Sequence, residues 1–231
     1  MSVAENFRAI KTALGDKIIL VAVTKNHGVE AMREAIDAGA SDIGENRVQE
    51  AAEKFQTLDR QVTRHLIGHL QTNKVKAAVK LFDVIQSVDS QHLAAAIDKA
   101  AAAAGKVQDI LIQVNVAREE QKSGVLSEDL NALITFVDAA KNLRLRGLMM
   151  IAPNFDDVEE CRPLFKRMRN LFDELKPARE AFDFLSMGMT HDYKIAVEEG
   201  ANVVRIGTAI FGERSYVNGN NRQGQPESGA V

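Results

Sequence analysis

The sequence has a single cysteine, no long apolar run and no block of basic residues. Cys161 alone cannot form an internal disulfide, which fits a reducing compartment. No apolar stretch approaches the ~20 residues that a membrane-spanning helix needs. With a formal net charge of -3 and no cluster of Lys and Arg, the chain offers no basic surface for a nucleic-acid backbone. We therefore expect neither a nucleic acid nor a membrane among its partners.

The composition is that of an ordinary globular protein. Its 231 residues are 45% hydrophobic and 26% charged, which is enough to bury one core without a metal ion or disulfides. The first residues lack a basic segment followed by an apolar one, so we expect a cytoplasmic protein.

Residues 18–25 give the clearest structural signal. The run is apolar and rich in Ile and Val until it ends at Thr24 and Lys25, a pattern typical of a strand covered on both faces in a parallel sheet. Lys25 then stands at the carboxyl end of that strand, where burial disfavours the charged amine and leaves a nucleophile for carbonyls. The alternative is that Lys25 is only the first solvated residue after a buried strand.

Eight such strand segments alternate with helical segments along the chain. We expect strands at residues 18–25, 42–46, 64–68, 84–88, 110–116, 145–151, 182–187 and 203–207. This alternation predicts a single (β/α)₈ barrel of the TIM type over residues 1–216, preceded by an extra N-terminal helix. An open doubly wound sheet is the alternative, but its Gly-rich dinucleotide turn is absent. Residues 217–231 have no apolar periodicity, which predicts a disordered tail.

Two residues predict where helices end or break. Gly39 follows a helical segment and favours a left-handed cap. Pro163 lies inside the helical segment 156–175, and proline is tolerated only in a first turn, so we expect a break near Cys161.

Polar residues collect at the carboxyl ends of the predicted strands, the face where barrels build their sites. Taken alone, each of these residues is explained as a helix cap or a loop residue. His65 is better explained as a core histidine with satisfied hydrogen bonds than as a catalytic residue. Their shared location favours a site. They are Lys25, Asn46, His65, Gln86, Asn115, Ser186 and Arg205.

Residues 186–190 and 204–212 fall where strands seven and eight end, and loops at that place commonly bind a phosphate. Glycines let the backbone approach an anion closely, and hydroxyls add donors. The alternative is that the glycines serve tight turns only. The candidate groups are the backbone at Gly188 and Gly207 and the hydroxyls of Ser186, Thr190 and Thr208.

A lysine at strand one and a phosphate site at strands seven and eight fit pyridoxal 5'-phosphate (PLP), which carries an aldehyde and a phosphate. A lysine Schiff base of PLP needs a partner for the pyridine nitrogen, and Arg205 is the candidate by position. Guanidinium keeps its proton, so it donates to the ring nitrogen and opposes ring protonation. Such a ring is a weak electron sink.

Six motifs keep their order and spacing from residue 18 to residue 212. They read VAVTK (21–25), GENRVQE (44–50), HLIGHLQTNK (65–74), GLMMI (147–151), SMGMTHD (186–192) and VRIGTAIFG (204–212). Together they resemble the pyridoxal phosphate homeostasis protein family, which is related to the barrel domain of alanine racemase. Thr190 stands where that family usually has serine and retains the hydroxyl.

The resemblance implies a cofactor, PLP, and a role for each site residue. Lys25 is the implied Schiff-base lysine, Arg205 faces the pyridine nitrogen and Asn46 lies near the ring. The residues implied around the phosphate are Ser186, Gly188, Thr190, Gly207 and Thr208.

Three functions are consistent with such a site. The first is a non-catalytic carrier that holds PLP as a lysine aldimine, acts as a monomer and supplies apo-enzymes. The second is a PLP-dependent amino-acid racemase, which needs two bases and takes one of them from an additional domain for which we expect no residues here. The third is a Schiff-base aldolase, which needs neither PLP nor Arg205. We rank the carrier first and expect no turnover.

Overall fold

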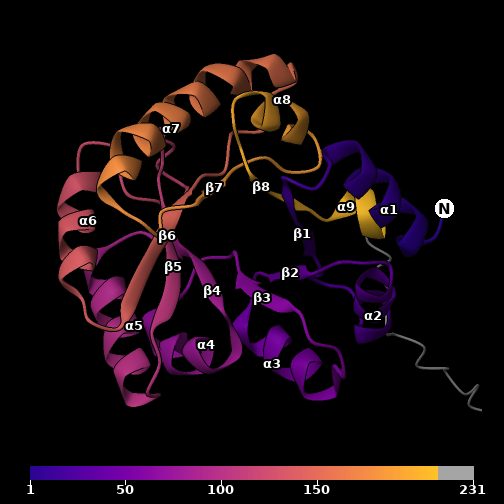
Figure 1. The fold of residues 1–231 in the computed structure, drawn as a ribbon, viewed down its shortest axis with the longest axis horizontal. Helices are drawn as coiled ribbons and strands as arrows, with labels where there is room; N and C mark the ends of the chain where they lie inside the picture. Colours follow the sequence, from indigo (N-terminus) through magenta and orange to yellow (C-terminus); the bar gives the residue numbers. More distant parts are fainter. Residues whose placement is uncertain (213–231) are drawn as a thin grey trace, which may run out of the picture.

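Eight parallel strands close into a barrel in the order of the sequence (Figure 1). The computed structural model describes residues 1–212. The barrel confirms the predicted fold class, and the predicted tail at residues 217–231 lies outside the described residues. The strands are β1 (Ile19–Val23), β2 (Asp42–Glu45), β3 (Thr63–Leu66), β4 (Val84–Val88), β5 (Gln108–Gln113), β6 (Leu143–Met149), β7 (Phe184–Ser186) and β8 (Val203–Ile206).

Helices surround this barrel, and α1 precedes the first strand as expected (Figure 1). Short 3₁₀ segments, η1 to η3, lead into or follow some of them. The helical elements are α1 (Val3–Leu14), α2 (Val29–Asp37), α3 (Val48–Thr57), η1 (Thr72–Lys74), α4 (Val75–Leu81), α5 (Gln91–Ala103), α6 (Leu130–Ala139), η2 (Val158–Cys161), α7 (Arg162–Leu175), η3 (Lys176–Ala178), α8 (Tyr193–Glu198) and α9 (Thr208–Phe211).

The local signals for helix ends are confirmed. Gly39 has φ 114°, a conformation that glycine adopts without the penalty other residues meet. The helical segment after β6 is divided at Cys161, and Pro163 lies in the first turn of α7, where its missing N–H leaves no hydrogen bond unmade.

Most strand residues are buried, although Arg144 of β6 is exposed, and the molecule has an outer and an inner apolar layer. The large cluster lies between strands and helices and includes Met32, Phe82 and Phe165. A separate small cluster of Val84, Leu111 and Met149 comes from strand positions that face the barrel axis. The remaining inward positions include polar side chains, and these build the site.

Every strand except β4 differs from its expected bounds by one to three residues at one or both ends. Two departures have a local cause. Strand β5 ends at Gln113 because Asn115 binds the following loop: its amide donates to the carbonyl of Glu119 at 2.8 Å, and its oxygen accepts the Glu119 N–H at 3.1 Å. The helix α9 directly after β8 was not predicted; it is a single turn, too short for an apolar repeat to indicate.

Two further structural findings concern residues 1–212. None of their helices is both long and apolar enough to cross a membrane. The same residues contain no group of three or more His, Cys, Asp or Glu side chains arranged to hold a metal ion.

Candidate functional site

The end of β1 is fixed by a partly buried cluster centred on Lys54 of α3. The Lys54 ammonium donates to the carbonyl of Thr24 at 2.8 Å, to Glu45 Oε1 at 2.8 Å and to Glu50 Oε1 at 2.6 Å. Thr24 is fully buried, and its hydroxyl donates to the same Glu45 oxygen at 2.6 Å. One lysine therefore joins β1, β2 and α3.

Lys25 lies between two anchored residues. The carbonyl of Thr24 is held by Lys54, and the N–H of Asn26 donates to Glu50 Oε1 at 2.5 Å. Asn26 has φ 62°, a left-handed conformation that asparagine tolerates better than most residues. The backbone on both sides of Lys25 is thus tied to α3, which fixes the direction in which its half-buried side chain leaves the strand.

The two carboxylates of this cluster differ in their electrostatics. Burial raises the pKa of Glu45, against the opposing effect of Lys54 and Thr24. Burial also acts to raise the pKa of Glu50, but the hydrogen bonds from Lys54 and Asn26 outweigh it and the pKa lies below its ordinary value. Glu45 Oε2 is buried and has no hydrogen-bond partner among the described residues. The ionised form of Glu45 is therefore stabilised mainly by Lys54.

Arg205 lies inside the barrel, on the strand next to β1. Its side chain donates to Ser186 Oγ at 2.6 Å and to the carbonyl of Met150 at 2.7 Å. The Ser186 hydroxyl in turn donates to Gln86 Oε1 at 2.7 Å. Arg205 is 3% exposed and Ser186 and Gln86 are 0% exposed, so the three residues form a hydrogen-bonded chain shielded from solvent.

The chain continues through His65 to Asp42. Gln86 Nε2 lies 2.9 Å from His65 Nδ1, and His65 Nε2 lies 2.9 Å from Asp42 Oδ1. A single assignment satisfies every group: His65 donates to Asp42 and accepts from Gln86. Both ring nitrogens are then bonded, which confirms the expectation that His65 is a satisfied core histidine.

These bonds give Ser186 a second possible role beside the predicted phosphate contact. Its single proton goes to Gln86, and one lone pair accepts from Arg205. A phosphate oxygen needs a donor, so Ser186 would have to break its bond to Gln86 to bind one. The geometry favours Ser186 as a residue that orients Arg205.

Arg205 fits the nitrogen of a pyridine ring. Burial lowers its pKa to about 10, and the charge of Asp192 opposes that shift; the side chain still carries its proton at neutral pH. Guanidinium has five N–H groups, and the bonds to Ser186 and Met150 use two of them. The others are donors for an acceptor such as a ring nitrogen.

The residues predicted at the phosphate lie at the ends of β7 and β8. Gly188 has φ 96°, and a Cβ at this position would lie 2.7 Å from the Cβ of Ala196, so α8 packs directly on its backbone. Thr190 is half-buried in the following loop. Thr208 begins α9 and is exposed, with Gly207 just before it.

The short helix α9 is attached to the loop that follows Lys25. The ring of His27 stacks on Phe211 with centroids 4.9 Å apart. On the other side of α9, the Asn6 amide of α1 donates to the carbonyl of Ile210 at 3.0 Å. The extra N-terminal helix therefore supports the turn that carries Thr208.

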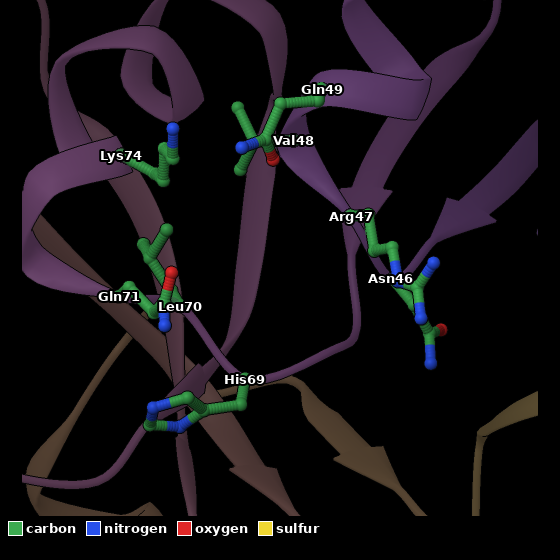
Figure 2. A pocket seen from close by; sticks show the side chains of 8 residues that line it. All are labelled: Asn46, Arg47, Val48, Gln49, His69, Leu70, Gln71 and Lys74. Carbon is green, nitrogen blue, oxygen red and sulfur yellow. The ribbon is translucent and has the colours of Figure 1, made fainter.

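Asn46 follows β2 and is half-buried. Its backbone is in close contact with the end of β3, because a Cβ on Gly68 would lie 2.4 Å from the Asn46 carbonyl oxygen. Asn46 also lines a cavity of about 320 Å³ between the loop after β2 and the loop after β3 (Figure 2).

The sequence reasoning missed most of the residues that hold this site. Glu45, Glu50 and Lys54 were not singled out, although the spacing of Glu50 and Lys54 is that of a helical i,i+4 ion pair. Gln86 was placed at a strand end without a partner. No sequence signal joins it to Ser186, which is 100 residues away.

The chain matches known proteins over most of its length. Residues 1–215 match the family described as alanine racemase, N-terminal domain. A pyridoxal phosphate homeostasis protein of Aquifex aeolicus is 44% identical over 199 residues, which cover 85% of this chain and 87% of the relative. The protein of that name from Escherichia coli K12 is 39% identical over 208 residues, covering 87% and 88%.

Solved structures agree with these matches. PipY of Synechococcus elongatus PCC7942, whose structure is described as having PLP bound, superposes with a TM-score of 0.84 at 38% identity and covers 91% of this chain and 100% of PipY. An alanine racemase of Clostridium difficile shares the fold, with a TM-score of 0.76 at 17% identity over 90% of this chain and 56% of the racemase. The chain therefore belongs to the family of pyridoxal phosphate homeostasis proteins, built on the N-terminal barrel domain of alanine racemase.

Proposed function

We propose that this protein binds PLP through the Nζ of Lys25 and serves as a carrier in PLP homeostasis. The observation that carries the proposal is Arg205, a buried donor held in one orientation on the strand beside β1. The relatives named pyridoxal phosphate homeostasis proteins and the PLP-bound PipY structure support the same ligand.

Each residue has a proposed part in binding. Arg205 donates to the pyridine nitrogen and Asn46 borders the ring. The hydroxyls of Thr190 and Thr208 and the backbone N–H groups near Gly188 and Gly207 take the phosphate. PLP supplies an aldehyde that condenses with a lysine amine with loss of water; the protein supplies the position of that amine.

The carrier function is favoured over a racemase by the names of the curated relatives, and Arg205 acts in the same direction. A guanidinium keeps its proton and opposes protonation of the pyridine nitrogen, so the ring withdraws electrons weakly. Cleavage of a Cα–H bond then receives little help. We further propose that the protein acts as a monomer in the cytoplasm and delivers PLP to apo-enzymes.

The first experiment locates the cofactor. Purified protein is loaded with PLP, reduced with borohydride and digested, and the labelled peptide is identified by mass spectrometry. We expect the label on Lys25, and we expect Lys25→Ala to lose the stable chromophore while Lys74→Ala keeps it. A label on another lysine of the wild-type protein contradicts the proposal.

The second experiment separates carrier from racemase. Holoprotein and an authentic alanine racemase are incubated with L- and D-alanine in D₂O, and deuterium at the α-carbon is followed by NMR. We expect negligible exchange with the carrier. Exchange at a rate comparable to that of the racemase would overturn the carrier assignment, and Arg205→Glu should raise whatever slow exchange is present.

A further inference from the structure

A cavity of about 320 Å³ opens between the loop after β2 and the loop after β3. Figure 2 shows Asn46 and Arg47 on one side of this space and His69, Leu70, Gln71 and Lys74 across from them, with Val48 and Gln49 at the start of α3. The cavity lies on the carboxyl-end face of the barrel, and it shares Asn46 with the proposed PLP site.

The lining is cationic and carries no acidic residue. Within residues 1–212, neither Arg47 nor Lys74 has a hydrogen bond or ion pair for its side chain. The charge of Arg47 helps to lower the pKa of Glu50, and Glu50 is already bonded to Lys54 at 2.6 Å. Two cations thus border one space without a hydrogen bond or ion pair of their own among the described residues.

The histidine on this rim adds a polar ring. His69 Nδ1 lies 3.2 Å from Ser123 Oγ and 3.8 Å from Asp89 Oδ2. These contacts involve one ring nitrogen and leave Nε2 for a further hydrogen bond. The side-chain amides of Asn46 and Gln71 supply further donors around the same cavity.

We propose that this cavity binds the phosphate group of a small phosphate monoester, at a site separate from Lys25. An arginine fork and an ammonium together match a phosphate dianion, because charge-assisted hydrogen bonds to phosphate are short and strong. The volume is near the lower end of that found for small-molecule sites. Because Asn46 borders both places, the occupant lies beside the proposed cofactor site and suits a phosphorylated ligand that enters or leaves it.

The test uses holoprotein whose PLP has been fixed by borohydride, so that the first site is blocked. Inorganic phosphate, glycerol phosphate, pyridoxamine 5'-phosphate and pyridoxamine are titrated by calorimetry, and the His69 ring is followed by NMR. Pyridoxamine 5'-phosphate has no aldehyde and cannot condense with a lysine. If no PLP is fixed on Lys25, the same titrations on the apoprotein still test the cavity. A failure of the cavity proposal can therefore be distinguished from a failure of the proposed PLP site at Lys25.

We expect one binding event for each phosphate compound, none for pyridoxamine, and a shift of the His69 signals. Arg47→Gln/Lys74→Gln should weaken phosphate binding by at least about tenfold, since each lost charged hydrogen bond is worth that factor or more. Arg8→Gln/Lys76→Gln removes the same charge from exposed positions outside the cavity and should bind like wild type. If pyridoxamine 5'-phosphate binds more tightly than glycerol phosphate, the cavity recognises the pyridine ring as well as the phosphate, as expected for a cofactor that enters or leaves the first site. If both bind equally, the cavity recognises the phosphate alone. A wild-type protein that binds no phosphate compound, or a cavity variant that binds like the control, overturns the proposal.

Discussion

Replacement of Lys54 by methionine tests whether one ion cluster holds the backbone around Lys25. Methionine keeps the length and the apolar body of the side chain and removes the ammonium. Three hydrogen bonds are lost, to Thr24, Glu45 and Glu50. Because the Glu45 side chain is 0% exposed, its charge would remain buried with the Thr24 hydroxyl as a donor but without a cation, and breaking a buried ion pair in this way costs about 3–5 kcal/mol.

The loss should depend on pH in a defined direction. Burial already raises the pKa of Glu45, and removal of Lys54 raises that pKa further. A carboxyl whose pKa is higher in the folded state than in the unfolded state favours folding below the unfolded pKa, and this contribution is lost as pH rises through the folded pKa. The variant should therefore lose about 3–5 kcal/mol at pH 8 and distinctly less at pH 5, where Glu45 takes up a proton.

The measurement is urea unfolding at pH 5 and pH 8, with PLP chromophore yield as a second readout. Lys76→Met removes an exposed lysine of α4 and serves as the control. Adding Glu45→Gln to Lys54→Met should restore part of the stability at pH 8, because the neutral amide needs no counter-charge. A loss below about 1 kcal/mol at pH 8, the scale of a surface ion pair, or an equal loss at both pH values refutes the reasoning.

Three further predictions concern the other parts of the site. Gln86→Leu should destabilise the fold by about 1–3 kcal/mol and change the absorbance of bound PLP, because it leaves Ser186 without an acceptor and loosens Arg205; an unchanged spectrum would show that the chain does not orient Arg205. Thr208→Val should weaken PLP binding by ~1–3 kcal/mol and leave pyridoxal binding nearly unchanged, and equal losses would place the phosphate elsewhere. Burial raises the pKa of Cys161 to about 11, so the native protein should react slowly with thiol reagents at pH 8 and quickly after denaturation; fast labelling of the native protein contradicts this.

Much of the architecture is determined by local patterns in the sequence. Residues 18–23 are apolar at every position, which is typical of a strand covered on both faces. Pro163 breaks its helix and Gly39 ends another because their backbone preferences act within one or two residues. Eight strand-helix alternations within the length of one domain predict a closed barrel. The position of Lys25 at a strand end follows from the bounds of the first strand.

The partners of the site residues were decided by the closure of the barrel. Asp42, His65, Gln86, Ser186 and Arg205 come from five strands. Their inward direction follows from alternation, but their contacts depend on the stagger between strands, which no single segment encodes. For the same reason Ser186, a plausible phosphate ligand by position, is turned toward Gln86 and Arg205. The sequence placed the polar residues on one face; the register of the closed sheet determined which of them bind one another.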